Sequence, residues 1–138
     1  MKTLKSVFVF LFLFTVFSIV KGQNPNTQSK SVAVINNAEI YFENTVHDYG
    51  TIRKNSKGSC EFVFKNTGDQ PLVLDNVKTS CGCTVPTWPK KTILPGKSGT
   101  IKVVYNTKKT GTFNKTITVM SNAKTDPVEL SINGTVIE

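Results

Sequence analysis

Residues 128–137, VELSINGTVI, decide the fold class of this chain. Every second residue from Val128 to Val136 is apolar or glycine, and the residues between them are polar as far as Thr135. Side chains of a β-strand point alternately to its two faces, so this pattern predicts a strand with one buried face. The segment is therefore expected to cover a core as part of a sheet.

The same alternation recurs in residues 99–106 and 60–65, and shorter runs predict strands at about 39–42, 46–49, 72–78 and 113–121. Residues 23–138 contain 16 Thr, 12 Val and 8 Ile against 3 Ala and 4 Leu, so local propensity favours strands over helices. Turn signals such as Pro95-Gly96 separate the runs. Together they predict an all-β fold, an immunoglobulin-like antiparallel β-sandwich of about seven strands.

The N-terminus has the layout of a secretory signal peptide. Lys2 and Lys5 precede an uncharged apolar run at 7–20, and the small residue Gly22 follows it. The run is shorter than the roughly 18–20 residues of a spanning helix. We therefore expect cleavage after residue 22, export to the periplasm or the extracellular space, and no stable membrane span afterwards. The polar residues 23–38 are expected to form a flexible tether before a domain at 39–138.

Charge excludes one class of partner. The chain carries 17 Lys and Arg against 9 Asp and Glu, and removal of three leader lysines leaves 14 − 9 = +5. The lysines are mostly isolated, and the few basic pairs are not interleaved with aromatic residues, so nucleic-acid binding is not expected. A protein or an anionic envelope polymer remains as the expected partner, with the oligomeric state open.

Cys81-Gly82-Cys83 is the one stretch that suggests chemistry. Two thiols at i and i+2 face the same side of an extended segment, and the glycine permits a sharp bend. An exported protein meets an oxidising compartment, so a labile or structural Cys81–Cys83 disulfide is expected. Alternatives are a paired-thiolate site for Cu(I) or Zn(II), a thiol-redox role, a bond from one of them to Cys60, or two reduced cysteines that only shape the loop.

Other candidates for chemistry are weaker. Cys60 shares a strand face with two phenylalanines, so it is expected to be a buried apolar thiol. His47 is the single histidine, and its position opposite Val46 in the alternation predicts a solvated residue rather than a ligand. The chain has no catalytic constellation or cofactor-binding motif. We therefore expect a protein that is not an enzyme and has no cofactor.

Trp88 is the candidate contact residue for a partner. It lies between Pro86 and Pro89, and a rigid proline-bounded loop can present an aromatic side chain at low entropic cost. The competing expectation is that the indole folds back and caps the end of the core.

Four motifs carry a resemblance to a known family: HDYGTI at 47–52, NTGDQPL at 66–72, SCGCTVP at 80–86 and PGKSGTI at 95–101. In this order they resemble the small exported bacterial proteins of the DUF1573 family, over about residues 42–136. The resemblance implies a single immunoglobulin-like sandwich, distantly similar to major sperm protein and PapD modules, and it implies no activity. Cys81 and Cys83 correspond to the family's paired cysteines, whereas Cys60 has no counterpart.

These observations lead to one expected function and one alternative. The expected function is that of an exported, non-enzymatic binding or structural module of the cell envelope or periplasm. Loops at one end of the sandwich, with Trp88 and the 81–86 loop, are the expected contacts. The alternative is a soft-metal or thiol-redox site at Cys81 and Cys83.

Overall fold

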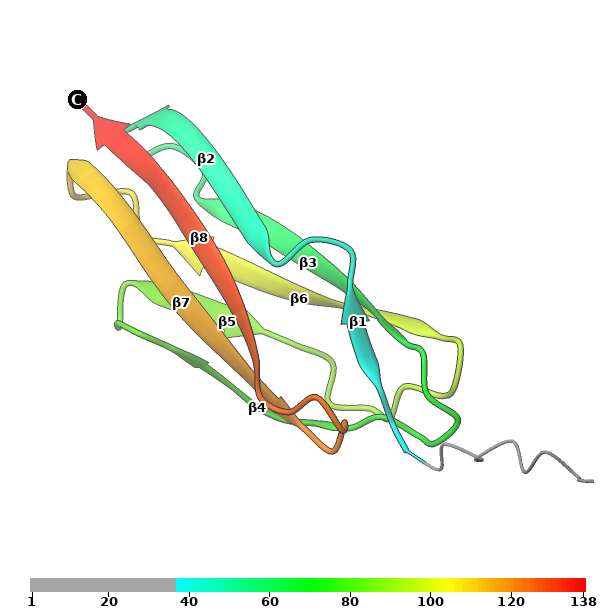
Figure 1. Cartoon of the computed structure of the whole chain (residues 1–138). Coiled ribbons are helices and arrows are strands. Elements are labelled where there is room, and N and C mark those ends of the chain that lie inside the picture. Colours follow the sequence, from blue (N-terminus) through cyan, green and yellow to red (C-terminus); the bar gives the residue numbers. More distant parts are fainter. Residues whose placement is uncertain (1–36) are drawn as a thin grey trace, which may run out of the picture. The chain divides into compact units, whose positions relative to one another are not determined.

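The structure of the protein is a computed structural model that describes residues 37–138 (Figure 1). The expected signal peptide at 1–22 and nearly all of the expected tether at 23–38 lie outside the described residues. Within them the chain forms eight strands: β1 Ile40–Phe42, β2 Val46–Arg53, β3 Ser59–Asn66, β4 Leu74–Thr79, β5 Thr84–Thr87, β6 Ser98–Tyr105, β7 Gly111–Ser121 and β8 Val128–Ile137.

The strands form two sheets of four that face each other (Figure 1). The first sheet has the order β1-β3-β6-β5, and the second has the order β2-β8-β7-β4. Alternation along the strands supplies the core between them, because β3 buries every second residue from Cys60 and β6 does so from Ile101. The all-β immunoglobulin-like sandwich predicted from the sequence is confirmed.

Two details of the topology differ from the expectation. First, residues 84–87 form an eighth strand, β5, where the sequence analysis predicts a loop. Proline lacks an N–H for the ladder and is tolerated on a strand with one free side, and β5 pairs with β6 alone. Second, β2 runs parallel to β8, whereas the other neighbours within the two sheets are antiparallel.

The Pro95-Gly96 turn between residue 93 and β6 has the predicted form. Gly96 has a φ of 75°, and the Lys97 amide donates to the Leu94 carbonyl at 3.0 Å. A positive φ at the third position is the requirement of a type II turn, which glycine meets without a steric penalty. This turn therefore sets where β6 begins.

Asn66 anchors the end of β3 and is fully buried. Its side-chain amide donates to the carbonyls of Gln70 at 2.8 Å and Ile93 at 2.9 Å. Its side-chain oxygen accepts from the amides of Gly68 at 3.0 Å and Glu39 at 3.4 Å. An asparagine side chain has two donor hydrogens and two acceptor lone pairs, so all four are used. We call this cluster the Asn66 corner; it fixes the end of the first sheet.

Candidate binding site around the Cys81–Cys83 turn

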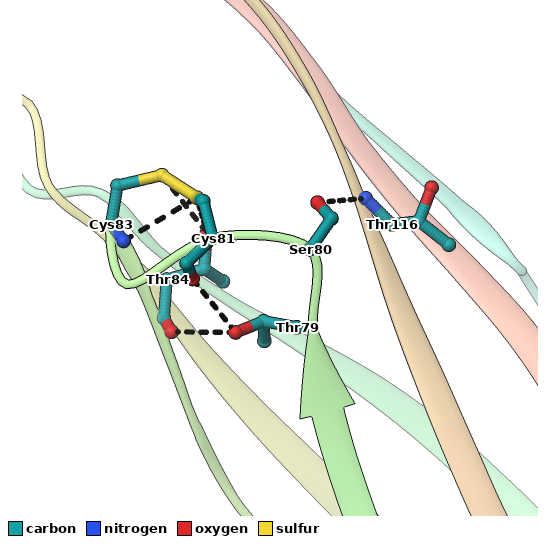
Figure 2. Close-up of a disulfide and its surroundings, with 6 residues drawn as sticks. All are labelled: Thr79, Ser80, Cys81, Cys83, Thr84 and Thr116. Atoms are coloured by element: carbon teal, nitrogen blue, oxygen red, sulfur yellow. Dashed lines mark hydrogen bonds between the residues drawn. A yellow bond between two sulfur atoms is a disulfide. The ribbon is translucent and has the colours of Figure 1, made fainter.

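The turn at residues 80–83 connects β4 of the second sheet to β5 of the first, and a disulfide joins Cys81 to Cys83 within it (Figure 2). Their Cα atoms are 5.3 Å apart. Both side chains are partly exposed. In this arrangement the two sulfurs are bonded to each other, and Cys60 is a free thiol.

Hydrogen bonds hold the turn to both sheets. The backbone of Ser80 bonds to the Thr116 carbonyl of β7 at 3.0 Å, and the Ser80 hydroxyl accepts from the Thr116 amide at 3.2 Å (Figure 2). On the other side, the Asn106 amide donates to the Cys83 carbonyl at 2.9 Å. Thr79 adds a side-chain hydroxyl 2.9 Å from the Cys81 carbonyl. These hydrogen bonds fix the position of the turn on the protein surface.

Cys60 lies in the core behind this region, as predicted. Its side chain is buried on β3, and burial raises the pKa of its thiol. Burial likewise raises the pKa of Tyr49, whose hydroxyl donates to the Gly58 carbonyl at 2.8 Å. Both groups therefore stay protonated and neutral near neutral pH, and the Tyr49 hydroxyl supports the loop before β3.

His47 is placed differently from the expectation. Val46 is exposed, whereas His47 is half-buried with its ring edge against Tyr49 at a centroid distance of 4.5 Å. Tyr49 faces inward to reach Gly58, and the period of two puts His47 on the same face. The expected solvated position therefore belongs to Val46.

Trp88 packs partly buried against the core, which is the competing expectation for this residue. Its Nε1 is buried without a hydrogen-bond partner among the described residues, and the Lys90 ammonium lies 3.3 Å from the ring centroid. Trp88 follows the far end of β5 from the disulfide, about 15 Å along an extended strand. The structure therefore does not bring Trp88 and Cys83 into one site, and contact of Trp88 with a partner stays a prediction.

An open depression of about 770 Å³ lies beside the disulfide turn, over the end of β6. Its floor includes Val104 of β6 and Val85 of β5, which are paired neighbours and are 45% and 60% exposed. One side is formed by the loop before β3 and the other by Gly82 and Cys83. We call this depression the trough; its lining residues are Asn55–Ser59, Gly82, Cys83, Val85, Lys102 and Val104–Lys108.

A second depression of about 440 Å³ shares part of this lining. Gly82, Cys83, Tyr105 and Asn106 line both, and Lys109 and Lys115 line only the second. In the sequence Lys115 is an isolated lysine and Lys109 belongs to a short basic pair, and both are expected to be solvated. The alternation in β6 does place Lys102 and Val104 on the outer face, but the turn and loop that complete the trough come from distant parts of the chain.

Within residues 37–138 no group of three or more His, Cys, Asp or Glu side chains is arranged to hold a metal ion. The same part of the chain has no helix long and apolar enough to cross a membrane.

Solved structures share this fold at low sequence identity. A protein of unknown function from Porphyromonas gingivalis W83 is 14% identical with a TM-score of 0.65, over 76% of this chain and 50% of that one. The PapD-like domain 7 of human CEP192 is 7% identical with a TM-score of 0.63, over 75% and 88%. The CupB2 chaperone of Pseudomonas aeruginosa is 9% identical with a TM-score of 0.50, over 70% and 55%. The chain thus spans about half of the first and the third protein.

The family is settled by sequence. No curated protein matches the chain. The family described as "Protein of unknown function (DUF1573)" matches it over residues 40–136, from the first residue of β1 almost to the end of β8. The match includes the four motifs that carried the resemblance and both cysteines of the turn. The chain therefore belongs to the DUF1573 family of proteins of unknown function.

Proposed function

We propose that this protein is an exported, non-enzymatic binding module of the cell envelope or periplasm, and that it binds a protein partner in the trough. The observation that carries the proposal is the pair of exposed valines, Val85 and Val104, on the floor of an open depression. Aliphatic side chains that lie together in a concave surface gain free energy when a partner removes them from water, at about 25 cal/mol per Å².

Three further observations support the proposal. Hydrogen bonds to both sheets preorganise the disulfide turn that walls the trough, so little ordering entropy is lost on binding. The layout of residues 1–22 supports export. Among the structures with this fold, CupB2 is a chaperone, and a chaperone acts on proteins.

The test compares two valines on the outer face of the first sheet. Val104 lies in the trough, whereas Val63 on β3 lies outside it with nearly the same exposure, 42% against 45%. A photocrosslinking amino acid is introduced at one position or the other, and the protein is produced and exported in its native cell. We expect a discrete crosslinked protein from position 104 and none from position 63. Equal crosslinking from both positions, or none from either, contradicts the proposal.

The alternative function at Cys81 and Cys83 is tested on the same purified protein. Intact mass and thiol counting report whether one thiol or three are free, and titration with Cu(I) and with Zn(II) reports metal uptake. One free thiol and no uptake agree with a disulfide that serves as a wall of the trough. Two further thiols that metal protects at submicromolar concentration would favour a soft-metal site instead.

A further inference from the structure

A group of lysines lies around the disulfide turn. Five of the twelve lysines in residues 37–138 line the trough or the second depression: Lys57, Lys102, Lys108, Lys109 and Lys115. No Asp or Glu of the described residues lines either depression. The disulfide turn therefore stands between two concave surfaces of the same positive sign.

Little of this charge is neutralised within the protein. Lys102 approaches Glu61 at 4.0 Å, but both side chains are more than half exposed, so this ion pair contributes little. The other four lysines have no carboxylate within ion-pairing distance among residues 37–138. Concave surfaces with one sign of charge raise the local concentration of ligands with the opposite sign. The ligand of this surface is therefore expected to be an anion.

The residues on the floor of the trough indicate which class of anionic ligand fits. Val85 and Val104 face each other across paired strands, where Cβ atoms lie about 5 Å apart, and they form one aliphatic spot. A sugar polymer is held by exposed aromatic faces and hydrogen bonds, but Tyr105 is the one aromatic residue that lines the depressions in the described domain, and it is only 8% exposed. Peptide side chains, in contrast, supply both carboxylates and aliphatic groups.

We infer that the two depressions bind an extended acidic segment of a partner protein. This inference rests on the proposed function and names the chemistry of its partner. An aliphatic side chain of the segment packs on Val85 and Val104, and its neighbours point away from the floor. The exposed side chains of Lys57 and Lys108 reach the carboxylates of these neighbours from the sides of the trough. The segment then passes over the Cys81–Cys83 turn, which both depressions share, toward Lys109 and Lys115.

The first experiment uses a short fluorescent peptide of alternating glutamate and valine, titrated with the full mature protein at low salt. The K57Q/K108Q double variant removes two lysines of the trough, and the matched K78Q/K124Q variant removes two exposed lysines that line neither depression. We expect about tenfold weaker binding for K57Q/K108Q, because two exposed ion pairs with the peptide are lost, and less than twofold weaker binding for the control. Equal weakening by both variants contradicts the inference.

Two comparison ligands test whether the surface prefers an acidic peptide with aliphatic side chains. A peptide of alternating lysine and valine should not bind, and V104S should weaken binding of the glutamate–valine peptide severalfold. Inorganic polyphosphate has no aliphatic groups and is expected to bind much more weakly than that peptide. If polyphosphate binds as tightly as the peptide and V104S changes neither affinity, the surface is a general polyanion site and the inference is wrong.

Crosslinking from position 104 separates this inference from the proposed function. If the native adduct forms and K57Q/K108Q reduces it while K78Q/K124Q does not, both stand. If the adduct forms equally with both double variants, the protein binds a partner in the trough but the partner segment is not acidic. If no adduct forms with the parent protein, the proposed function itself fails.

Discussion

The Asn66 corner and the Cys81–Cys83 turn lie at opposite ends of β6. Each holds the backbone beside its end of the strand, but by different contacts. Asn66 bonds to residue 97 just before β6 begins, and Cys83 bonds to residue 106 just after β6 ends. The corner is buried and uses every hydrogen-bonding group of its side chain, so it has nothing left to offer a ligand. The turn is held by a covalent bond, by backbone contacts and by the hydroxyls of Thr79 and Ser80, which leaves the surrounding lysines available for recognition.

The largest effect is expected from N66A. The substitution removes all four hydrogen bonds of a fully buried side chain: the Gly68 and Glu39 amides lose this acceptor, and the buried Ile93 carbonyl keeps only the Leu72 amide as a donor. Each buried group left unsatisfied costs about 1–3 kcal/mol. We expect a loss of about 3 kcal/mol or more in the free energy of unfolding, measured by urea denaturation.

The control for this prediction is N122A. Asn122 makes two side-chain hydrogen bonds, accepting from the Val73 amide at 2.8 Å and donating to the Pro71 carbonyl at 3.0 Å, but it is exposed, so water replaces the lost partners. We expect a cost below about 1 kcal/mol. Equal losses for the two variants would show that burial of the corner contributes nothing.

A smaller loss of stability is expected from G99A, at the same end of β6 as the Asn66 corner. A Cβ at Gly99 would press on the Phe64 ring, which is almost fully buried and packs against Phe42 at 5.7 Å between centroids. Overpacking of this kind costs about 1–3 kcal/mol. At the other end, G82A meets no atom within 4 Å. We expect thermal unfolding to shift clearly for G99A and hardly at all for G82A, and the reverse order contradicts the contrast between the two regions.

Sequence reasoning predicted most of the fold because the signals for it are local. Phe62 and Phe64 alternate with polar neighbours within one strand, and the Pro95-Gly96 turn is specified by two adjacent residues. The strand that was missed, β5, has a proline within four residues. Its existence depends on the free edge of β6 beside it, which no local pattern reports.

The candidate site could be predicted only in part. Gly82 between two cysteines marks the turn, but whether Cys81 meets Cys83 or Cys60 depends on how β3 lies relative to the turn. The trough depends on a register that pairs Val85 with Val104. Spacing along the chain does not encode that register. For the same reason it does not show that five lysines, which are mostly far apart in the sequence, line neighbouring depressions.

Removal of the disulfide is expected to lower the free energy of unfolding less than N66A does. In the chain-entropy account, closing a loop of three residues constrains the unfolded state by about 1.5 kcal/mol, much less than a long loop would. The C81S/C83S variant should therefore unfold at a slightly lower urea concentration than the parent. A thiol reductant should lower the parent to the same midpoint and leave the variant unchanged. A loss as large as that of N66A would mean that the turn, too, holds the fold together.

The smallest loss of stability is expected from Y49F. Tyr49 supports Gly58 in the loop that forms one side of the trough. The variant loses the hydroxyl that donates to the Gly58 carbonyl and keeps the ring contacts with His47 and Phe113, so it should cost about 1 kcal/mol near neutral pH. The cost should depend on pH, because burial raises the pKa of Tyr49 above its ordinary value of 10.0.

The sign of that dependence follows from the ionisation of the unfolded chain. Below pH 10 the phenol is neutral in both states, and the stability from Tyr49 is fully present. As the pH rises above 10, Tyr49 ionises in the unfolded state before it does so in the folded state, so the parent loses stability that Y49F cannot lose. Cys60 titrates in both proteins and largely cancels from the comparison. Urea midpoints of the two proteins should therefore converge above pH 10. A difference that stays constant or widens there would show that Tyr49 is solvated, and that the loop before β3 lacks the support that the trough requires.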